Sequence, residues 1–99
     1  KFYDTRDYGK AFKKFSKLAN QNDVNAQQYL GDMYYRGDGV EKDYKKAIVW
    51  YQKAAVQDDG WSQYHLGVMY YYGRGVKKNT KKGLELIEQA AQDGWERAK

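Results

Sequence analysis

The feature that most constrains this sequence is an internal repeat. The eleven residues LGDMYYRGDGV at positions 30–40 return as LGVMYYYGRGV at positions 66–76, a step of 36 residues. The same step relates further pairs, among them Met33 and Met69, Gly37 and Gly73, and Ala54 and Ala90. A fixed period of this length is typical of architectures in which similar units stack in a row. We therefore expect a repeat protein.

Each unit contains two stretches whose apolar residues recur at three- and four-residue steps, which is the spacing of one helical face. The expected helices are 4–21, 24–36, 43–58, 60–72 and 79–92. Asp43 and Asn79 stand near two of the helix starts, where a side-chain acceptor caps free backbone N–H groups. The sequence therefore predicts an all-α fold of antiparallel helix pairs.

These helices divide a single repeat domain, residues 1–99, into unequal parts. The expected parts are a lone helix of a half repeat over 4–21, repeat one over 24–59, repeat two over 60–95, and the start of a further helix over 96–99. One amphipathic helix cannot bury its apolar face alone, so the helices of a pair pack together and each pair packs on the next. Small residues at fixed positions, such as Gly31 and Gly67, let neighbouring helices approach closely.

Composition limits the classes of function. The absence of cysteine excludes disulfides and thiolate metal sites. No apolar run is long enough to cross a membrane, so membrane insertion is not expected. The formal net charge of +5 comes with interspersed acidic residues and without a nucleic-acid motif, so nucleic acid is not an expected partner. Eleven Tyr, three Trp and three Phe supply large, rigid side chains for a core or a contact surface.

No cluster in the sequence predicts a catalytic residue, a metal site or a cofactor. His65 is the single histidine, and we interpret it as a half-buried packing residue. Asp58 and Asp59 are neighbours in sequence and point to different sides, so we interpret them as part of a solvated turn. The loops that begin at Gly37 and Gly73 lack the lysine and serine of a phosphate-binding loop. We interpret these glycines as helix ends with positive φ.

The repeated pattern is A-Q-x-x-L-G-x-M-Y-x-x-G-x-G-V followed by D-Y-x-K-A-x-x-W-Y-x-K-A-A, which begins at Ala26 and ends at Ala55. This pattern resembles the Sel-one-like repeat, a relative of the tetratricopeptide repeat. Repeat two departs from the pattern at Ser62, Gly83, Leu86 and Ile87. A tetratricopeptide unit is typically 34 residues long, so the 36-residue step favours the Sel-one-like family.

The resemblance implies a right-handed α-solenoid, an α–α superhelix related to tetratricopeptide domains, that serves as a non-catalytic adaptor for other proteins. Bacterial members often begin, after an export signal, with a half unit like the one in this sequence. The resemblance therefore implies an extracytoplasmic location in a bacterium, periplasmic or secreted, with the cytoplasm as the alternative.

Comparison of the two repeats predicts the partner-binding residues. Positions that are identical in both repeats serve stacking, whereas positions that differ are free to serve function. The first helix of each repeat differs most on the arc opposite Leu30 and Met33. The candidates on this arc are Gln28, Asp32, Tyr35 and Arg36 in repeat one, and Trp61, Tyr64, Val68, Tyr71 and Tyr72 in repeat two. In the tetratricopeptide superhelix this helix lines the concave groove, so we expect a protein or peptide partner on the concave face, with the aromatic residues as anchors.

Three alternatives stay open. With equal weight, the aromatic arc of repeat two is an inter-repeat core that packs against a following repeat beginning at Trp95. An aromatic groove also suits carbohydrates, so glycan binding is an alternative function. Self-association is the third, because an apolar end of a solenoid can stack on a second copy and produce a homo-oligomer.

Overall fold

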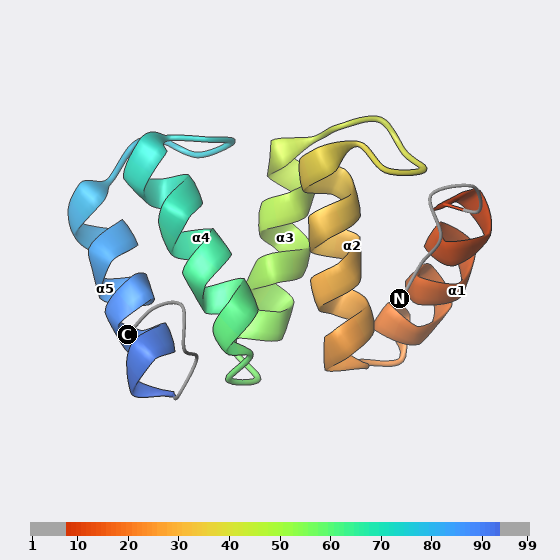
Figure 1. Ribbon diagram of the computed structural model, residues 1–99, viewed down its shortest axis with the longest axis horizontal. Coiled ribbons are helices and arrows are strands. Elements are labelled where there is room, and N and C mark those ends of the chain that lie inside the picture. Colours follow the sequence, from red (N-terminus) through yellow and green to blue (C-terminus); the bar gives the residue numbers. More distant parts are fainter. Residues whose placement is uncertain (1–7, 94–99) are drawn as a thin grey trace.

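The computed structural model describes residues 8–93, and five helices without any strand make up the secondary structure of this range. The helices are α1 (Tyr8–Asn20), α2 (Val24–Arg36), α3 (Tyr44–Ala55), α4 (Gly60–Tyr72) and α5 (Thr80–Gln92). They stand side by side in chain order, and successive helices run in opposite directions (Figure 1). The predicted all-α solenoid of antiparallel helix pairs is confirmed.

The boundaries of the two first helices, 24–36 and 60–72, agree with the sequence prediction. The second helix of repeat one is shorter than predicted, because the chain turns after Ala55 and Asp58 adopts a positive φ of 65°. A left-handed residue cannot continue a right-handed helix. The expected helical residues before Tyr8 and the predicted helix start at 96–99 lie outside the described residues.

Each helix from α2 to α5 begins at an acidic or amide residue that caps it. The capping residues are Asp23, Asp43, Asp59 and Asn79, and each side chain accepts a hydrogen bond from the backbone N–H three residues later. The caps predicted at Asp43 and Asn79 are confirmed. Asp59, interpreted from the sequence as part of a solvated turn, instead caps α4 and also accepts from the Ser62 hydroxyl at 2.6 Å.

The conformation of the loops after α2 and α4 explains why both contain glycine at equivalent positions. Gly37 and Gly73 end these helices with φ of 77° and 73°, which confirms the predicted helix ends. Gly75 lies against the start of α3, where an added Cβ would stand 2.7 Å from the Cβ of Tyr44. Gly39 makes the equivalent approach to Tyr8 at the start of α1. Each loop therefore rests on the second helix of the preceding repeat.

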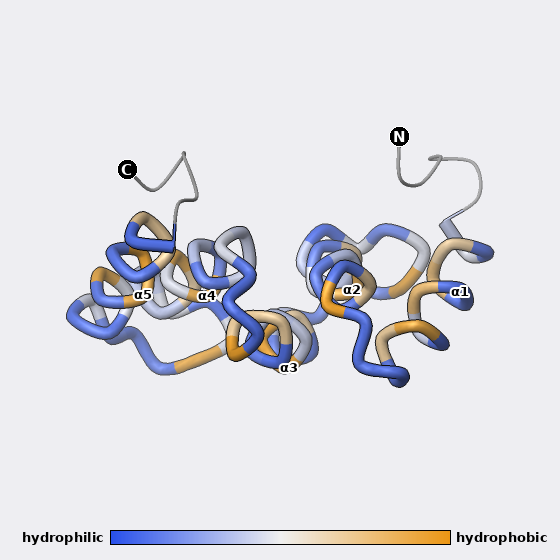
Figure 2. The backbone as a smooth tube through the Cα atoms, turned by 90° about the horizontal axis from the view of Figure 1, so that it is seen from below, coloured by the Kyte–Doolittle hydropathy of each residue, from blue (hydrophilic) through white to orange (hydrophobic). Residues whose placement is uncertain are grey.

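Seen along the view of Figure 2, α3 lies to one side of α2 and α4. Every pair of successive helices is in contact, and α2 also touches α4 across α3. None of the helices between Tyr8 and Asp93 is long and apolar enough to span a bilayer.

The core consists of two clusters, and each cluster joins a second helix to the first helix that follows it. The buried residues of the first are Phe15, Ala19, Ala26, Leu30 and Met33, from α1 and α2. Those of the second are Ala47, Ile48, Tyr51, Leu66 and Met69, from α3 and α4. Burying one large apolar side chain contributes about 1.5–3 kcal/mol. Since both clusters cross a repeat boundary, much of this stabilisation arises between repeats.

Within repeat two, α4 and α5 approach so closely that only glycine fits at the contact. An added Cβ at Gly83 would stand 2.6 Å from the carbonyl oxygen of Gly67 and 2.8 Å from the backbone nitrogen of Tyr71. Both obstacles are backbone atoms, which cannot rotate away as a side chain can. Contact with the α4 backbone therefore constrains Gly83, the residue at which the sequence departs from the alanine of repeat one.

We predict that Gly83→Ala lowers the free energy of unfolding by about 1–3 kcal/mol, because the helices must separate to admit the methyl group. The effect opposes the higher helix propensity of alanine, which favours the variant by about 1 kcal/mol. Urea denaturation followed by far-UV circular dichroism measures the change. Gly9→Ala is the matched control, since no atom lies within 4 Å of its added Cβ. Equal effects of the two substitutions would contradict the packing argument.

Candidate functional site

The structure separates the predicted partner-binding residues into two groups. Asp32, Tyr35 and Arg36 of α2 lie near Trp61 of α4, where repeat one meets repeat two. Tyr64, Val68, Tyr71 and Tyr72 of α4 line a groove with Leu84 and Ile87 of α5. We call this second group the α4/α5 groove. Gln28 is half-buried on α2.

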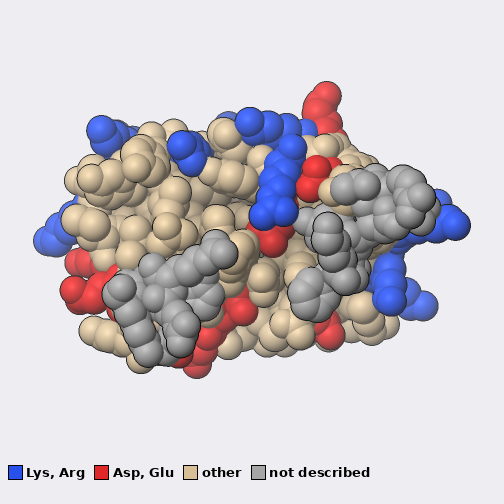
Figure 3. Space-filling model, viewed as in Figure 1, with Lys and Arg blue, Asp and Glu red and all other residues tan. Residues whose placement is uncertain are grey.

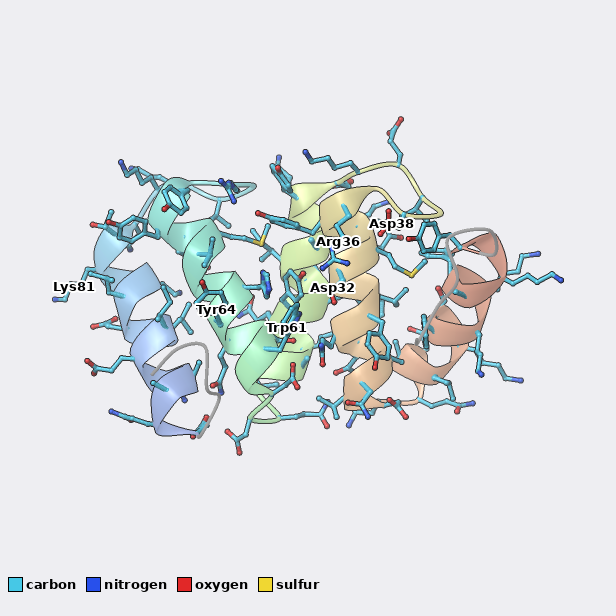
Figure 4. All side chains as sticks on the ribbon, viewed as in Figure 1. Asp32, Arg36, Asp38, Trp61, Tyr64 and Lys81 are labelled. Atoms are coloured by element: carbon cyan, nitrogen blue, oxygen red, sulfur yellow. The ribbon has the colours of Figure 1, made fainter. Side chains whose placement is uncertain are left out.

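Asp32 is the hydrogen-bonding centre of the first group. Its side chain is 6% exposed, and one carboxylate oxygen, Oδ1, accepts from the hydroxyl of Tyr51 at 2.5 Å and from the indole Nε1–H of Trp61 at 3.0 Å. Figure 4 shows Asp32 and Arg36 of α2 facing Trp61 of α4. The predicted polar contact residue Asp32 therefore joins three helices of its own chain. It lies inside the inter-repeat contact and not on the outward arc that the sequence suggested.

Burial is the main cause of the raised pKa values of Asp32 and Tyr51. Desolvation raises the pKa of the Asp32 carboxyl, while hydrogen bonds from Tyr51 and Trp61 and the charge of Arg36 oppose the rise. Burial and the neighbouring carboxylate also raise the pKa of Tyr51. The Tyr51 hydroxyl therefore stays protonated at neutral pH and remains a donor to Asp32.

His65 lies inside a cluster of aromatic rings. Its ring stacks on Tyr51 with centroids 5.5 Å apart and an interplanar angle of 15°, and it lies 4.5 Å from the ring centroid of Trp61. Tyr35 and Tyr64 approach it edge-on at 6.1 and 5.4 Å. The predicted role as a half-buried packing residue is confirmed. This cluster and the Asp32 hydrogen bonds hold α4 against α2 and α3.

Tyr35 has a further contact that crosses the repeat boundary. Its hydroxyl oxygen accepts a hydrogen bond of 2.5 Å from the guanidinium of Arg74, which lies in the loop after α4. The Arg74 guanidinium also lies 4.9 Å from the ring centroid of Tyr72. Arg74 therefore connects the two groups of candidate residues.

The α4/α5 groove is an open, mainly aromatic and aliphatic concavity of about 320 Å³. Tyr72 is 59% and Leu84 56% exposed. The ring of Tyr71 packs edge-on against that of Tyr72 at 4.9 Å. Figure 3 shows mostly uncharged side chains over α4 and α5 on this face, with basic side chains at the edge near the 73–79 connection. The groove therefore offers apolar surface, with basic side chains at the margin near the 73–79 connection.

The 36-residue step relates this groove to an occupied surface in repeat one. The residues equivalent to the six that line it are Gln28, Asp32, Tyr35, Arg36, Ile48 and Tyr51. Asp32, Tyr35 and Tyr51 contact α4, and Ile48 shares a core cluster with Leu66. In repeat one these positions hold the first helix of the next repeat. In repeat two, the equivalent positions form the α4/α5 groove.

Sequence reasoning missed Tyr51, Leu84, Ile87 and Arg74. The first three lie on second helices, whereas the predicted residues all lie on first helices. The signal was present, because Ile87 stands where repeat one has Tyr51 and Val68 where it has Asp32. Asp32 and Tyr51 are hydrogen-bonded, whereas Val68 and Ile87 are aliphatic. This replacement indicates that the surface of repeat two contacts a different set of side chains.

The fold and the repeated inter-helix contacts define a helical-repeat solenoid, a class whose members bury a continuous core between stacked units. The family model of the Sel1 repeat matches residues 3–23, 24–59 and 62–95. The chain belongs to the Sel1 repeat family. Proteins of this family are typically helical-repeat scaffolds for protein interactions, without catalytic activity. The search of curated proteins found no match.

Solved structures of Sel1 repeat proteins are similar to this chain. A Sel1 repeat protein from Oxalobacter formigenes is 38% identical with a TM-score of 0.88, over 93% of this chain and 38% of that one. A protective antigen of uropathogenic Escherichia coli with an SLR fold is 40% identical with a TM-score of 0.88, over 94% and 20%. Helicobacter pylori cysteine-rich protein B is 38% identical with a TM-score of 0.82, over 88% and 65%. The chain thus spans less than two thirds of each of these structures.

We predict that Asp32→Asn changes how stability depends on pH. Since the folded pKa of Asp32 is raised, the folded state binds the proton more tightly than the unfolded state does, and this carboxyl destabilises the fold as pH rises above about 4. An asparagine oxygen can still accept from Tyr51 and Trp61 and does not ionise. The stability of the variant relative to the natural protein should therefore rise between pH 4 and pH 7.

Urea denaturation at the two pH values measures this difference. Asp32→Ala is the control, because it leaves the donors of Tyr51 and Trp61 without an acceptor and should cost about 1–3 kcal/mol at both pH values. Parallel pH dependence of the natural protein and the asparagine variant would show that Asp32 ionises as an ordinary exposed carboxyl.

Proposed function

We propose that this chain is a non-catalytic interaction scaffold that binds a protein or peptide partner on its concave face, with the α4/α5 groove as the principal site. The predicted anchors Tyr64, Val68, Tyr71 and Tyr72 all line this groove. Aromatic side chains bury a large area at low entropic cost, which is why they are frequent interface anchors. Arg36, exposed on α2 in the first group of candidate residues, is the proposed polar contact.

The observation that supports this proposal is the equivalence between the groove and the surface of repeat one that holds α4. A surface of this geometry accepts one helix, packed against a first and a second helix at once. The segment that fits this surface is therefore an amphipathic α-helix, laid into the groove by its apolar face, and it belongs either to a partner, as we propose, or to a following repeat.

The chemistry of the groove restricts which helix fits. In repeat one, Asp32 and Tyr51 face α4 and Asp32 accepts the indole N–H of Trp61. The equivalent residues of the groove, Val68 and Ile87, have no acceptor. A buried polar group without a partner costs about 1–3 kcal/mol, so a tryptophan at the Trp61 position would be disfavoured here. The partner helix should present aliphatic or phenyl side chains.

A display library of amphipathic helical peptides tests this function with defined probes. We expect selected peptides to carry aliphatic or Phe residues on one face and to shift the NMR methyl signals of Val68, Leu84 and Ile87. Tyr72→Ala should weaken their binding about tenfold, which corresponds to about 1.4 kcal/mol. The same substitution should change the free energy of unfolding by less than about 0.5 kcal/mol, because Tyr72 is 59% exposed.

Val49→Ala is the matched control, since Val49 is 51% exposed on α3 and lies outside the groove. Its binding should equal that of the natural protein. A second variant, Val68→Asp, restores the carboxylate of repeat one and should favour peptides that carry Trp. Selection of no peptide, or binding that is indifferent to both Tyr72→Ala and Val68→Asp, would refute the groove as a partner site. Competition of the selected peptides by oligosaccharides would instead support glycan binding.

We also propose an extracytoplasmic location in a bacterium. This proposal rests on the resemblance to the Sel1 repeat proteins of bacteria described above.

A further inference from the structure

A pair of equivalent cavities lies away from the α4/α5 groove, one in each repeat, and each contains a buried glutamine. The cavity of repeat one, about 320 Å³, is lined by Ala19, Asn20, Asn22, Gln27, Trp50, Lys53, Val56 and Gln57. The cavity of repeat two, about 330 Å³, is bounded by α3, α4 and α5 and contains Gln63, which is equivalent to Gln27. Gln27 is 2% exposed and Gln63 1%. We call the second the Gln63 cavity.

In repeat one, every polar atom of the buried amide is engaged. Gln27 Nε2 donates to the carbonyl oxygen of Ala19 at 3.4 Å and to Asn22 Oδ1 at 3.2 Å. Its oxygen, Oε1, accepts from Gln57 Nε2 at 2.8 Å, and Gln57 Nε2 also lies 3.3 Å from Asn22 Oδ1. Three amide side chains therefore form one network at the end of α3.

In repeat two the amide network has lost its donor. Gln63 Nε2 still donates to the carbonyl oxygen of Ala55 at 3.3 Å, the counterpart of the Ala19 bond. Gln63 Oε1, however, is a buried oxygen with no hydrogen-bond donor. The reason is visible in the sequence: Asp93 stands at the position of Gln57, and Asp58 at that of Asn22. An ionised carboxylate has no hydrogen to donate.

The same exchanges change the charge around the cavity. Among the residues that line the cavity, the carboxylate of Asp58 replaces the neutral amide of Asn22, and the smaller, donor-free side chain of Leu86 replaces the indole of Trp50. The cavity lies beside the C-terminal end of α3, where the helix dipole favours positive charge. Its other walls include Leu66 and Tyr70, which are apolar surfaces.

We propose that the Gln63 cavity binds a basic side chain of a partner polypeptide, with its ammonium group donating to Gln63 Oε1 and its methylene stem along Leu66 and Leu86. An ammonium group supplies donors only, and the carboxylate of Asp58, which lines the cavity, complements its charge. Lys82, which also lines the cavity, lies with Nζ 4.6 Å from the ring centroid of Tyr70. Lys46 lies over Tyr34 in the same way in repeat one, so this contact belongs to the scaffold of the repeat. No residue of the α4/α5 groove takes part, so this inference is independent of the proposed function.

Titration with n-butylammonium chloride, monitored through the side-chain amide signals in ¹H–¹⁵N NMR spectra, tests the proposal on the intact chain. We expect saturable shifts of the Gln63 amide and of the Leu66 and Leu86 methyl groups. Tetramethylammonium chloride at the same ionic strength has no N–H donor and should leave the Gln63 amide unshifted. Asp93→Gln, which supplies the donor that Gln57 supplies in repeat one, should weaken binding at least about fivefold and raise the midpoint of thermal unfolding.

The converse variant, Gln57→Asp, controls for general effects of charge. It should leave the response of Gln63 unchanged and create a new response at Gln27, because Gln27 then loses its donor. Equal shifts with tetramethylammonium, or unchanged binding after Asp93→Gln, would overturn the proposal. Either result would show that the cation senses surface charge and not the unpaired oxygen.

Discussion

The packing of one side chain, Tyr51, makes the two repeats a single body. It is fully buried in α3, its ring lies in the space left by Gly31 on α2, and the same ring stacks on His65 of α4. Its hydroxyl donates to Asp32, which in turn accepts from Trp61. Asp32 of repeat one thus gains its second donor, Trp61, only when the first helix of repeat two is in place. Folding of the pair is therefore more favourable than folding of either repeat alone, as expected for a solenoid.

The fold could be predicted from the sequence because a 36-residue period and a helical spacing of apolar residues leave few alternatives. Both first helices, the caps at Asp43 and Asn79, and the glycine helix ends followed from residue type and position. The end of α3 did not, because Asp58 turns the chain through a positive φ that the helical pattern does not reveal. Such a backbone conformation in a residue other than glycine is uncommon, and sequence alone gives it little weight.

The candidate site was harder to predict, for a physical reason that Asp32 illustrates. A helical wheel treats a polar residue opposite the core stripe as exposed, yet a solenoid helix has a third neighbour in the next repeat. Asp32 points to that neighbour and is buried because Tyr51 and Trp61 supply donors. The wheel identified the arc correctly as the place where repeats differ. It did not distinguish a surface that faces solvent from one that faces another repeat.

Differences between the repeats carry more information when they are considered as sets of hydrogen-bonding partners. Loss of a donor and its acceptor together, as where Val68 and Ile87 replace Asp32 and Tyr51, leaves an apolar surface with nothing unsatisfied. Loss of the donor alone, as where Asp93 replaces Gln57, leaves the buried oxygen of Gln63 unpaired. The first change leaves no unpaired polar group and alters which side chains can pack on the surface. The second leaves an unpaired buried oxygen, which lowers the stability of the folded chain. A ligand that donates to Gln63 removes that penalty, so the chemistry of the missing partner can be inferred from the neighbouring repeat.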